Sequence, residues 1–210
     1  MTQTAPASVP GLAVRGVAMW RGEQCLFESL DFTAQAGSTV LVVGANGAGK
    51  TTLLRAIAGL AVPTAGRIEW RGIDVRALPP ERRGEIAYRG HTEGVKRDLT
   101  VRENLLFARR IAGSAADIER IARELGLERK LDVRTRYLSA GQRRRVGLAA
   151  LRLAKARLWV LDEPMTHLDA AGRRLVAEWI GRHVDDGGVA VVATHQPDEL
   201  ARSGALVVEL

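Results

Sequence analysis

The chain has 210 residues, of which 46% are hydrophobic and 4% aromatic, so length and composition suit one compact domain with an aliphatic α/β core and exclude extensive disorder. The formal net charge of +7 favours an acidic partner such as nucleic acid, a nucleotide or an anionic membrane face, although a solvated arginine-rich surface would show the same excess. The single cysteine excludes an intrachain disulfide, no apolar run is long enough to span a bilayer, and the first residues show no secretory signal, so we expect a cytoplasmic protein.

The first 36 residues predict a loose tail followed by antiparallel strands. Residues 1–10 are small, polar and proline-bearing, which is typical of a flexible tail. Short apolar segments then follow at Leu12–Val14, Gly16–Trp20 and Leu30–Ala34, separated by Arg-Gly and Ala-Gly pairs that indicate turns.

A strand, a glycine-rich loop and a helix are predicted next. Thr39–Val43 is a short aliphatic run, and Thr51–Ala58 has helical character that Gly59 would end. Ile68–Trp70 and Ile86–Tyr88 are further strand candidates.

The middle third of the chain predicts helices. Thr100 with Glu103 forms a capping-box pattern before an apolar run, and Ser114 with Asp117 repeats it before a second helix. A third helix is expected from Ser139 to about Ala154.

The last third returns to strand and helix in alternation. Leu158–Leu161 and Val189–Ala193 are buried-strand runs, and a helix is expected between them at Ala170–His183. Such alternation predicts a parallel sheet.

The glycine-rich segment fits the phosphate-loop pattern G-x-x-x-x-G-K-[ST] between a strand and a helix. The charged Lys50 side chain would contact the β and γ phosphates of a nucleotide. The Thr51 hydroxyl would be a ligand of Mg²⁺, and Thr52 would donate a hydrogen bond to phosphate. Backbone N–H groups of the loop would surround the phosphates. The loop residues are Gly44, Ala45, Asn46, Gly47, Ala48 and Gly49.

Two adjacent carboxylates end the aliphatic strand at 158–161. In phosphate-loop enzymes the first, Asp162, would complete the Mg²⁺ shell. Glu163 would then lie close enough to the γ-phosphate to act as general base toward water. The alternative is a solvated acidic turn before Pro164.

Residues 138–142, Leu-Ser-Ala-Gly-Gln, separate this chain from phosphate-loop kinases and GTPases. By themselves Ser139 and Gln142 form a capping box that begins a helix and exposes N–H donors. The stretch resembles the signature sequence of the ATP-binding-cassette (ABC) family, and the resemblance covers about residues 12–210.

This resemblance implies an α/β fold: a phosphate-loop ABC cassette with a RecA-like parallel-sheet core, an antiparallel β subdomain and a helical subdomain at about residues 92–155, all in one domain of residues 11–210. It further implies MgATP as cofactor, ATP hydrolysis, and a head-to-tail homodimer. In that dimer the signature residues of one protomer would contact ATP held by the other; they are Ser139, Ala140, Gly141 and Gln142.

Other landmarks of the family follow in order. Trp20 resembles the aromatic residue that stacks on adenine, and Leu168-Asp169 resembles the loop that crosses the dimer interface. His195 resembles the switch histidine that contacts the γ-phosphate and holds water and the general base in place. His91 occupies the position where most cassettes carry glutamine, which puts the metal contact of that position in doubt.

Residues 90–96 and 194–197 resemble, more specifically, the CcmA family of cytochrome c biogenesis (haem exporter) ATP-binding proteins. That resemblance implies integral membrane subunits as partners, a peripheral location on the cytoplasmic face of the inner membrane, and a role in haem export, haem delivery or release of a haem chaperone. No Cys-x-x-Cys-His motif is present, so direct haem binding is not expected.

The sequence leaves three alternative functions to consider. An ABC subunit for another cargo, such as a lipid, peptide or ion, would share every catalytic residue. A nucleic-acid-associated ABC protein is suggested by Arg143, Arg144 and Arg145, although a solvated helix face or a subunit contact explains that run and no nucleic-acid partner is expected. A phosphate-loop GTPase would need a guanine-reading Asn-Lys-x-Asp motif, which is lacking.

Overall fold

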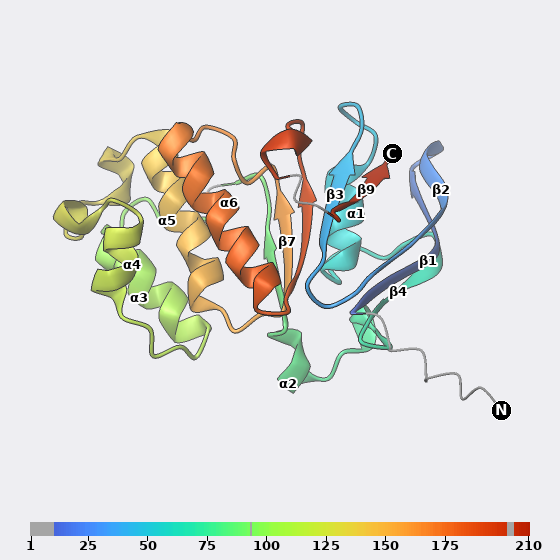
Figure 1. Cartoon of the computed structure of the whole chain (residues 1–210), viewed down its shortest axis with the longest axis horizontal. Coiled ribbons are helices and arrows are strands. Elements are labelled where there is room, and N and C mark those ends of the chain that lie inside the picture. The colour runs from blue at the N-terminus through green and yellow to red at the C-terminus, as the bar shows by residue number, and fades with distance from the viewer. Residues whose placement is uncertain (1–10, 93, 201–203) are drawn as a thin grey trace.

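The computed structural model describes residues 11–92, 94–200 and 204–210, so the predicted tail at 1–10 lies outside the described residues. It contains two sheets (Figure 1). The antiparallel sheet has the order β2-β1-β4-β5 and is formed by β1 (Leu12–Arg21), β2 (Gln24–Ala34), β4 (Ala65–Trp70) and β5 (Ile73–Asp74). The parallel sheet has the order β6-β7-β8-β3-β9 and is formed by β3 (Thr39–Val43), β6 (Ile86–Arg89), β7 (Leu158–Asp162), β8 (Val189–Ala193) and β9 (Leu206–Glu209).

Helices cover both faces of the parallel sheet (Figure 1). One helix, α1, lies between the two sheets, and α5 and α6 pack on the opposite face, with α3 and α4 beyond them. The helices are α1 (Lys50–Ile57), α2 (Pro80–Arg83), α3 (Val101–Ile111), α4 (Ile118–Glu124), α5 (Ala140–Leu153) and α6 (Ala170–Asp185). The predicted α/β architecture with an antiparallel sheet, a parallel sheet and a group of helices is confirmed.

Strand β7 shows why the parallel strands are aliphatic throughout. All five of its residues are buried, and successive side chains point to opposite faces of the sheet. Leu158 and Val160 belong to the core shared with α1 and β1, whereas Trp159 and Leu161 belong to the core shared with α5 and α6. The middle of the sheet is therefore buried on both sides, and the end of β7 is where its residues can reach a ligand.

The predicted break between Leu12–Val14 and Gly16–Trp20 is wrong. The two segments form one continuous strand, β1, whose pairing with β2 shifts register between Val14 and Val17. Gly16 has a positive φ of 54° there, and its N–H donates to Asp31 Oδ1 at 2.9 Å. The Arg15-Gly16 pair marks a β-bulge, because a glycine can take the bulge conformation without ending the strand, whereas Arg21-Gly22 leads into the predicted turn between β1 and β2.

Two of the three predicted helix starts are confirmed, and one is displaced. Thr100 and Ser139 both cap their helices in reciprocal capping boxes. The third helix, α4, begins at Ile118 and is capped by Asp117, whose carboxylate accepts from the N–H groups of residues 119 and 120. Ser114 lies earlier and accepts only from the N–H of Ala116, because the chain between them remains a loop.

Within the described residues, no helix is both long enough and apolar enough to cross a membrane.

His183 of α6 predicts a pH dependence of stability. Its ring stacks on Trp159 with centroids 4.1 Å apart, and its Nε2 lies 3.2 Å from the Val189 carbonyl oxygen. Burial lowers the pKa of the His183 imidazole below its ordinary value. The unfolded chain therefore binds this proton more readily, so the free energy of unfolding should fall as the pH drops below about 6.5.

Denaturant unfolding at pH 8 and pH 5.5 measures this effect, and His183→Phe keeps the stacking while removing the titrating group. The variant should lose less stability than the parent between the two pH values. An equal loss in both proteins would contradict the role given to His183.

Candidate nucleotide site

The phosphate loop joins β3 to α1, and its backbone needs glycine at its ends. Gly49 is the N-cap of α1 with a φ of 102°, and Gly44 has a φ of 145°. A Cβ added at Gly44 would lie 2.5 Å from the Leu210 carbonyl oxygen, and one at Gly49 would lie 3.0 Å from the Phe27 ring. These positions let the loop turn tightly before the helix N-terminus, where N–H groups bind phosphate.

Lys50 is held over this loop. Its side chain is largely buried, and its Nζ donates to the carbonyl oxygens of Gly44 at 2.6 Å and Ala45 at 2.9 Å. The ammonium group thus lies beside the turn in which phosphate oxygens would bind, and its charge complements theirs.

The two predicted magnesium ligands lie next to each other. Thr51 Oγ1 donates to Asp162 Oδ2 at 2.8 Å, although the two residues are separated by 111 positions in the chain. Asp162 is the last residue of β7 and is buried. One carboxylate and one hydroxyl, completed by water and phosphate oxygens, are the ligands that Mg²⁺ takes in phosphate-binding enzymes, so these residues fit the ion.

Glu163 and His195 meet beside this pair. The backbone of Glu163 is in the left-handed region with φ 48°, and its N–H donates to the Ala193 carbonyl oxygen at 3.0 Å. His195 Nε2 lies 3.4 Å from Glu163 Oε1, and within the described chain no group donates a hydrogen bond to that oxygen. The carboxylate can therefore accept a proton from a water bound beside it in the cavity, while the imidazole contacts the carboxylate directly.

A cavity of about 470 Å³ brings these groups together. It lies at the carboxyl ends of β7, β8 and β3, which are neighbours in the parallel sheet, and this edge is where open α/β sheets bind ligands. The predicted site residues that line it are Asn46, Gly47, Gly49, Lys50, Thr51, Thr52, His91, Asp162, Glu163 and His195. Arg21, Leu26 and Thr166 also line it but were not singled out from the sequence.

Trp20, the residue predicted to contact adenine, does not line this cavity, whereas its neighbour Arg21 does. The Trp20 side chain is 44% exposed at the end of β1, where Trp20 pairs with Cys25 and Arg21 pairs with Gln24. Arg21 lines the nucleotide cavity, and its guanidinium is a second candidate for the base contact. A planar guanidinium can stack on a base as an aromatic ring does.

Arg21→Ala should therefore weaken ATP binding by about two- to fivefold, the size of one exposed cation–π contact. Trp20→Ala should leave the affinity within error of the parent, as should Arg15→Ala, an exposed arginine on the same strand. Fluorescence titration with ATP measures all three. A larger loss of ATP affinity in Trp20→Ala than in Arg21→Ala would show that the tryptophan, and not the arginine, contacts the base.

The signature residues lie apart from this cavity. Ser139 Oγ accepts from the N–H of Gln142 at 3.2 Å, and both Ser139 and Ala140 are exposed. None of residues 139–142 lines the cavity that holds Lys50.

The signature helix also contacts the loop before α6. A Cβ at Gly141 would lie 2.8 Å from the carbonyl oxygen of His167, so glycine allows the two segments to approach closely. Leu168 is buried, and Asp169 caps α6 by accepting from the N–H of Gly172 at 2.8 Å. The two family landmarks are therefore packed together within one chain.

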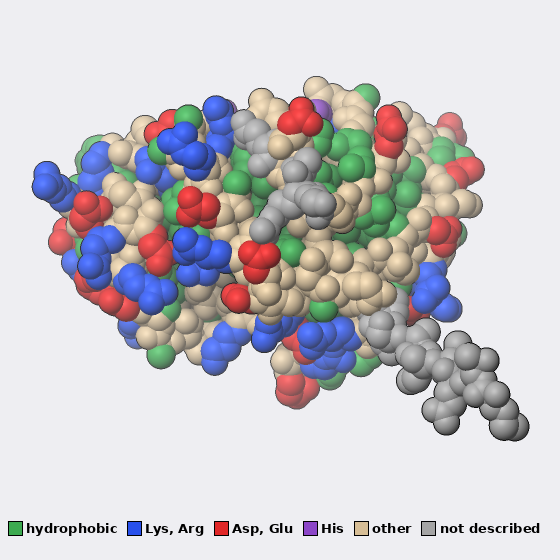
Figure 2. All heavy atoms as spheres, in the orientation of Figure 1, with side chains coloured by type: hydrophobic (Ala, Val, Ile, Leu, Met, Phe, Trp, Pro, Cys, Tyr) green, Lys and Arg blue, Asp and Glu red, His purple; other side chains and the backbone are tan. Residues whose placement is uncertain are grey.

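The arginine run at the start of α5 is engaged inside the protein. Arg143 Nη1 donates to the Leu138 carbonyl oxygen at 2.6 Å, and Arg145 Nη1 donates to that of Leu125 at 2.8 Å. Arg144 is only 5% exposed, so the expectation of a solvated helix face is wrong for it. On the face seen in Figure 2, basic and acidic side chains are interspersed over the helical part of the molecule, without a field of one sign.

Arg144 connects the signature helix to the catalytic edge of the sheet, a role that sequence reasoning missed. Its Nη1 donates to the carbonyl oxygens of residues 90–92 at 3.0–3.3 Å. Its Nη2 donates to those of Asp162 at 3.0 Å and Glu163 at 2.7 Å. One guanidinium thus holds the loop that carries His91 against the end of β7.

Comparison with known families agrees with this geometry. The family described as ABC transporter matches residues 27–166. A solved structure titled "Structure of ATP binding subunit of ABC transporter" superposes with a TM-score of 0.80 at 26% identity, covering 95% of this chain and 85% of that one. A putative ABC transporter ATP-binding protein from Pyrococcus furiosus, at 24% identity and a TM-score of 0.80, shares the fold over 95% of this chain and 96% of its own.

Relatives named "Cytochrome c biogenesis ATP-binding export protein CcmA" match nearly the whole chain. The protein from Nitrosococcus oceani is 40% identical over 95% of this chain and 92% of its own. The protein from Nitrosomonas europaea is 40% identical over 99% of this chain and 98% of its own. The protein from Escherichia coli O157:H7 is 41% identical over 91% of this chain and 92% of its own. The chain is therefore an ATP-hydrolysing cassette of the ABC transporter family and belongs with the CcmA proteins.

Proposed function

We propose that this chain is the ATP-hydrolysing subunit of a membrane complex in cytochrome c maturation, where it powers haem export, haem delivery or release of a haem chaperone. The observation that carries the proposal is the full-length similarity, at about 40% identity, to proteins named for cytochrome c biogenesis. An ABC subunit for a lipid, a peptide or an ion would share the site, and the experiment below distinguishes the two.

The roles proposed for the site residues follow from their positions. Lys50 binds the terminal phosphates of ATP, and Thr51 and Asp162 would hold Mg²⁺, which would offset the charge of the phosphates. Glu163 accepts the proton of the attacking water, and His195, whose Nε2 lies 3.4 Å from Glu163 Oε1, orients that carboxylate. Phosphate oxygens that gain charge during hydrolysis are stabilised by Lys50 and the loop N–H groups.

The second half of the site would come from another copy of this chain. Residues 139–142 are a helix start with exposed N–H donors, but they do not line the cavity of their own chain. A head-to-tail homodimer would bring them to the γ-phosphate of the partner, and the loop at Leu168-Asp169 beside them would then lie at the dimer interface.

Integral membrane subunits are the other proposed partners, and they place the cassette peripherally on the cytoplasmic face of the inner membrane. His91 lines the nucleotide cavity, and its loop is bonded to Arg144 of the signature helix, so a movement of the helices would reach the nucleotide through this loop. Haem binding and nucleic-acid binding by this chain are not part of the proposal.

The test replaces the native gene with its Glu163→Gln version. Because glutamine keeps the shape of the side chain but cannot accept a proton, ATP binding should persist while hydrolysis falls by at least about 100-fold. Membranes are then stained for covalently bound haem, with b-type cytochromes as the internal standard. Selective loss of c-type cytochromes is the expected result.

Glu178→Gln is the matched control, since Glu178 is exposed on α6 and pairs with Arg182 at the surface. It should leave both hydrolysis and c-type cytochromes at parental levels. Unchanged c-type cytochromes in the Glu163→Gln strain would contradict the maturation role and favour another cargo. Parental hydrolysis by purified Glu163→Gln protein would instead contradict the general-base role.

A further inference from the structure

The most exposed aromatic residue of the described chain lies directly before the signature sequence. Tyr137 ends a short 3₁₀ helix, Thr135–Tyr137, and is 70% exposed. Trp20 and Phe107, the other exposed aromatic residues, are 44% and 46% exposed. Tyrosine is enriched at interfaces, where its ring is covered by a partner and its hydroxyl keeps a polar contact, so the position of Tyr137 suits an interface.

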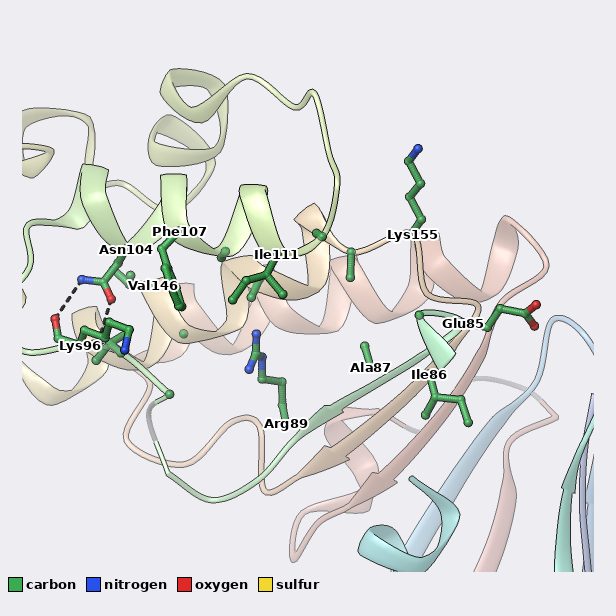
Figure 3. A pocket seen from close by; sticks show the side chains of 18 of the residues that line it. Glu85, Ile86, Ala87, Arg89, Lys96, Asn104, Phe107, Ile111, Val146 and Lys155 are labelled. Carbon is green, nitrogen blue, oxygen red and sulfur yellow. Dashed lines mark hydrogen bonds between the residues drawn. The ribbon is translucent and has the colours of Figure 1, made fainter. Parts of the chain in front are cut away.

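The turn that carries Tyr137 is anchored to the loop before α3. Thr135 is fully buried, its N–H donates to the Leu99 carbonyl oxygen at 2.9 Å, and its Oγ1 donates to that of Lys96 at 3.0 Å. Asn104 of α3 holds the same loop, since it accepts from the Lys96 N–H at 2.8 Å and donates to the Lys96 carbonyl oxygen at 3.0 Å (Figure 3). The backbone that presents Tyr137 is therefore fixed on both sides.

The ring of Tyr137 is also held. The guanidinium of Arg136 lies over the ring, 4.9 Å from its centre, and Arg136 Nη1 donates to Asp98 Oδ1 at 3.2 Å. This cation–π contact occupies one face of the ring. Because the residue is 70% exposed, the ring can still receive a second planar group on its other face.

The nucleotide cavity leaves room for such an aromatic group. Phenylalanine, tyrosine and tryptophan are absent from the residues that line it in the described chain. Arg21 of β1 is a planar lining side chain, whereas the His195 imidazole contacts Glu163 and so lies at the catalytic end. A bound base that rests on Arg21 would have its second face open to an aromatic ring from another chain.

The signature sequence would bring Tyr137 to the nucleotide of the partner. Ser139, at the helix start proposed to meet the γ-phosphate of the partner, is only two residues beyond Tyr137, a span of at most about 7 Å. The chain's own loop closes the side of this helix start at Gly141, where a Cβ would lie 2.8 Å from the His167 carbonyl oxygen. The ribose and base of that nucleotide therefore have room on the side of Tyr137 and not on the side of Gly141.

We propose that Tyr137 stacks on the base of the ATP held by the partner protomer and so helps to select the nucleotide. Each composite site would then take its γ-phosphate contact and one face of its base contact from the same helix start of the second chain. Arg136 supports the ring from behind. This inference rests on the head-to-tail homodimer of the proposed function.

Dimer formation by the full chain with MgATP, measured by sedimentation velocity, tests the contact. Glu163→Gln is the parent for this experiment, because it should retain ATP and keep the dimer closed. In this parent, Tyr137→Ala should weaken MgATP-dependent dimerisation at least about fivefold, the lower end of the effect of removing an aromatic ring from a stacked base. Tyr137→Phe should dimerise as the parent does, because phenylalanine keeps the ring.

Phe107→Ala is the matched control. Phe107 is also an exposed ring under a cation, with the Lys96 ammonium 4.8 Å from its centre, but it lies on α3 and outside the nucleotide cavity. It should dimerise as the parent does. Titration with ATP at protein concentrations too low for dimerisation should give parental affinity in Tyr137→Ala. A loss of affinity in that monomer would assign the ring to its own chain's site and overturn the inference.

The choice of nucleotide separates stacking from an indirect effect on the signature helix. MgUTP presents the same phosphates with a smaller base, so Tyr137→Ala should reduce the preference of dimerisation for MgATP over MgUTP by at least about threefold. Equal weakening with both nucleotides would mean that the substitution displaced the phosphate contact, and the stacking role would be wrong.

The remaining outcomes separate the two proposals. Parental dimerisation by Tyr137→Ala with MgATP would overturn the inference while the homodimer stands. Failure of the Glu163→Gln parent to dimerise with MgATP would count against the homodimer and the inference together.

Discussion

Lys50→Ala is expected to abolish detectable ATP hydrolysis and to weaken ATP binding by at least about tenfold. The ammonium group supplies charge-assisted hydrogen bonds, each worth about 1.5–3 kcal/mol, and it is the only lysine lining the described nucleotide cavity. It also tethers the loop through the carbonyl oxygens of Gly44 and Ala45. Loss of Lys50 therefore removes both a phosphate contact and a restraint on the loop that binds the phosphates.

Equilibrium titration with ATP and a phosphate-release assay measure the two effects separately. Arg55→Ala is the matched control, because it removes a cation from an exposed position on the same helix outside the cavity. It should bind and hydrolyse ATP as the parent does. Parental affinity in Lys50→Ala would show that the loop backbone suffices and would remove Lys50 from the site.

Arg144→Met is expected to lower the free energy of unfolding by about 3 kcal/mol and to reduce hydrolysis by at least about tenfold. The substitution leaves the carbonyl oxygens of residues 90–92, Asp162 and Glu163 without their common donor, which is itself buried. ATP affinity should change much less, because none of these bonds involves the phosphate loop. A loss in turnover with retained binding would mark Arg144 as a positioning residue for Glu163 and the His91 loop.

Denaturant unfolding gives the stability change, and titration and turnover assays separate binding from hydrolysis. Arg145→Met is the matched control, since the guanidinium of this neighbouring residue donates to the Leu125 carbonyl oxygen at the C-terminus of α4. Arg144→Lys should recover part of the turnover, because an ammonium reaches fewer of the same carbonyl groups. Parental turnover and stability in Arg144→Met would rule out the role described here.

Local sequence was enough to predict the phosphate loop and the two carboxylates at the end of β7. The glycines, Lys50 and Thr51 all lie within eight consecutive residues, 44–51, between a strand and a helix, so a short motif is enough to identify the loop. Asp162 and Glu163 end a strand in which every side chain is buried, and the end of such a strand is where a polar group can reach a ligand. The capping boxes at Thr100 and Ser139 could also be predicted locally, because each involves residues only three positions apart.

Sequence alone left the exact residue open at two places. At the end of β1, Arg21 lines the nucleotide cavity and Trp20 does not, because the irregular pairing of β1 with β2 sets which residue comes beside the cavity. Before α4, Ser114 and Asp117 were both plausible caps, and the loop between them decided for Asp117. Composition cannot distinguish such alternatives, because each side chain is chemically suitable.

By itself, the sequence determined the α/β class, the ABC resemblance and the residues that meet phosphate, since these depend on short motifs and on the pattern of buried strands. Only the tertiary structure decided that Arg144 is buried among five carbonyl groups from two separate segments. An arginine in sequence is equally suited to solvent, to a carbonyl cluster or to a partner. For Arg144, three of the five carbonyl groups belong to residues 52–54 positions away in the chain, and they meet it only when the sheet and helices have packed.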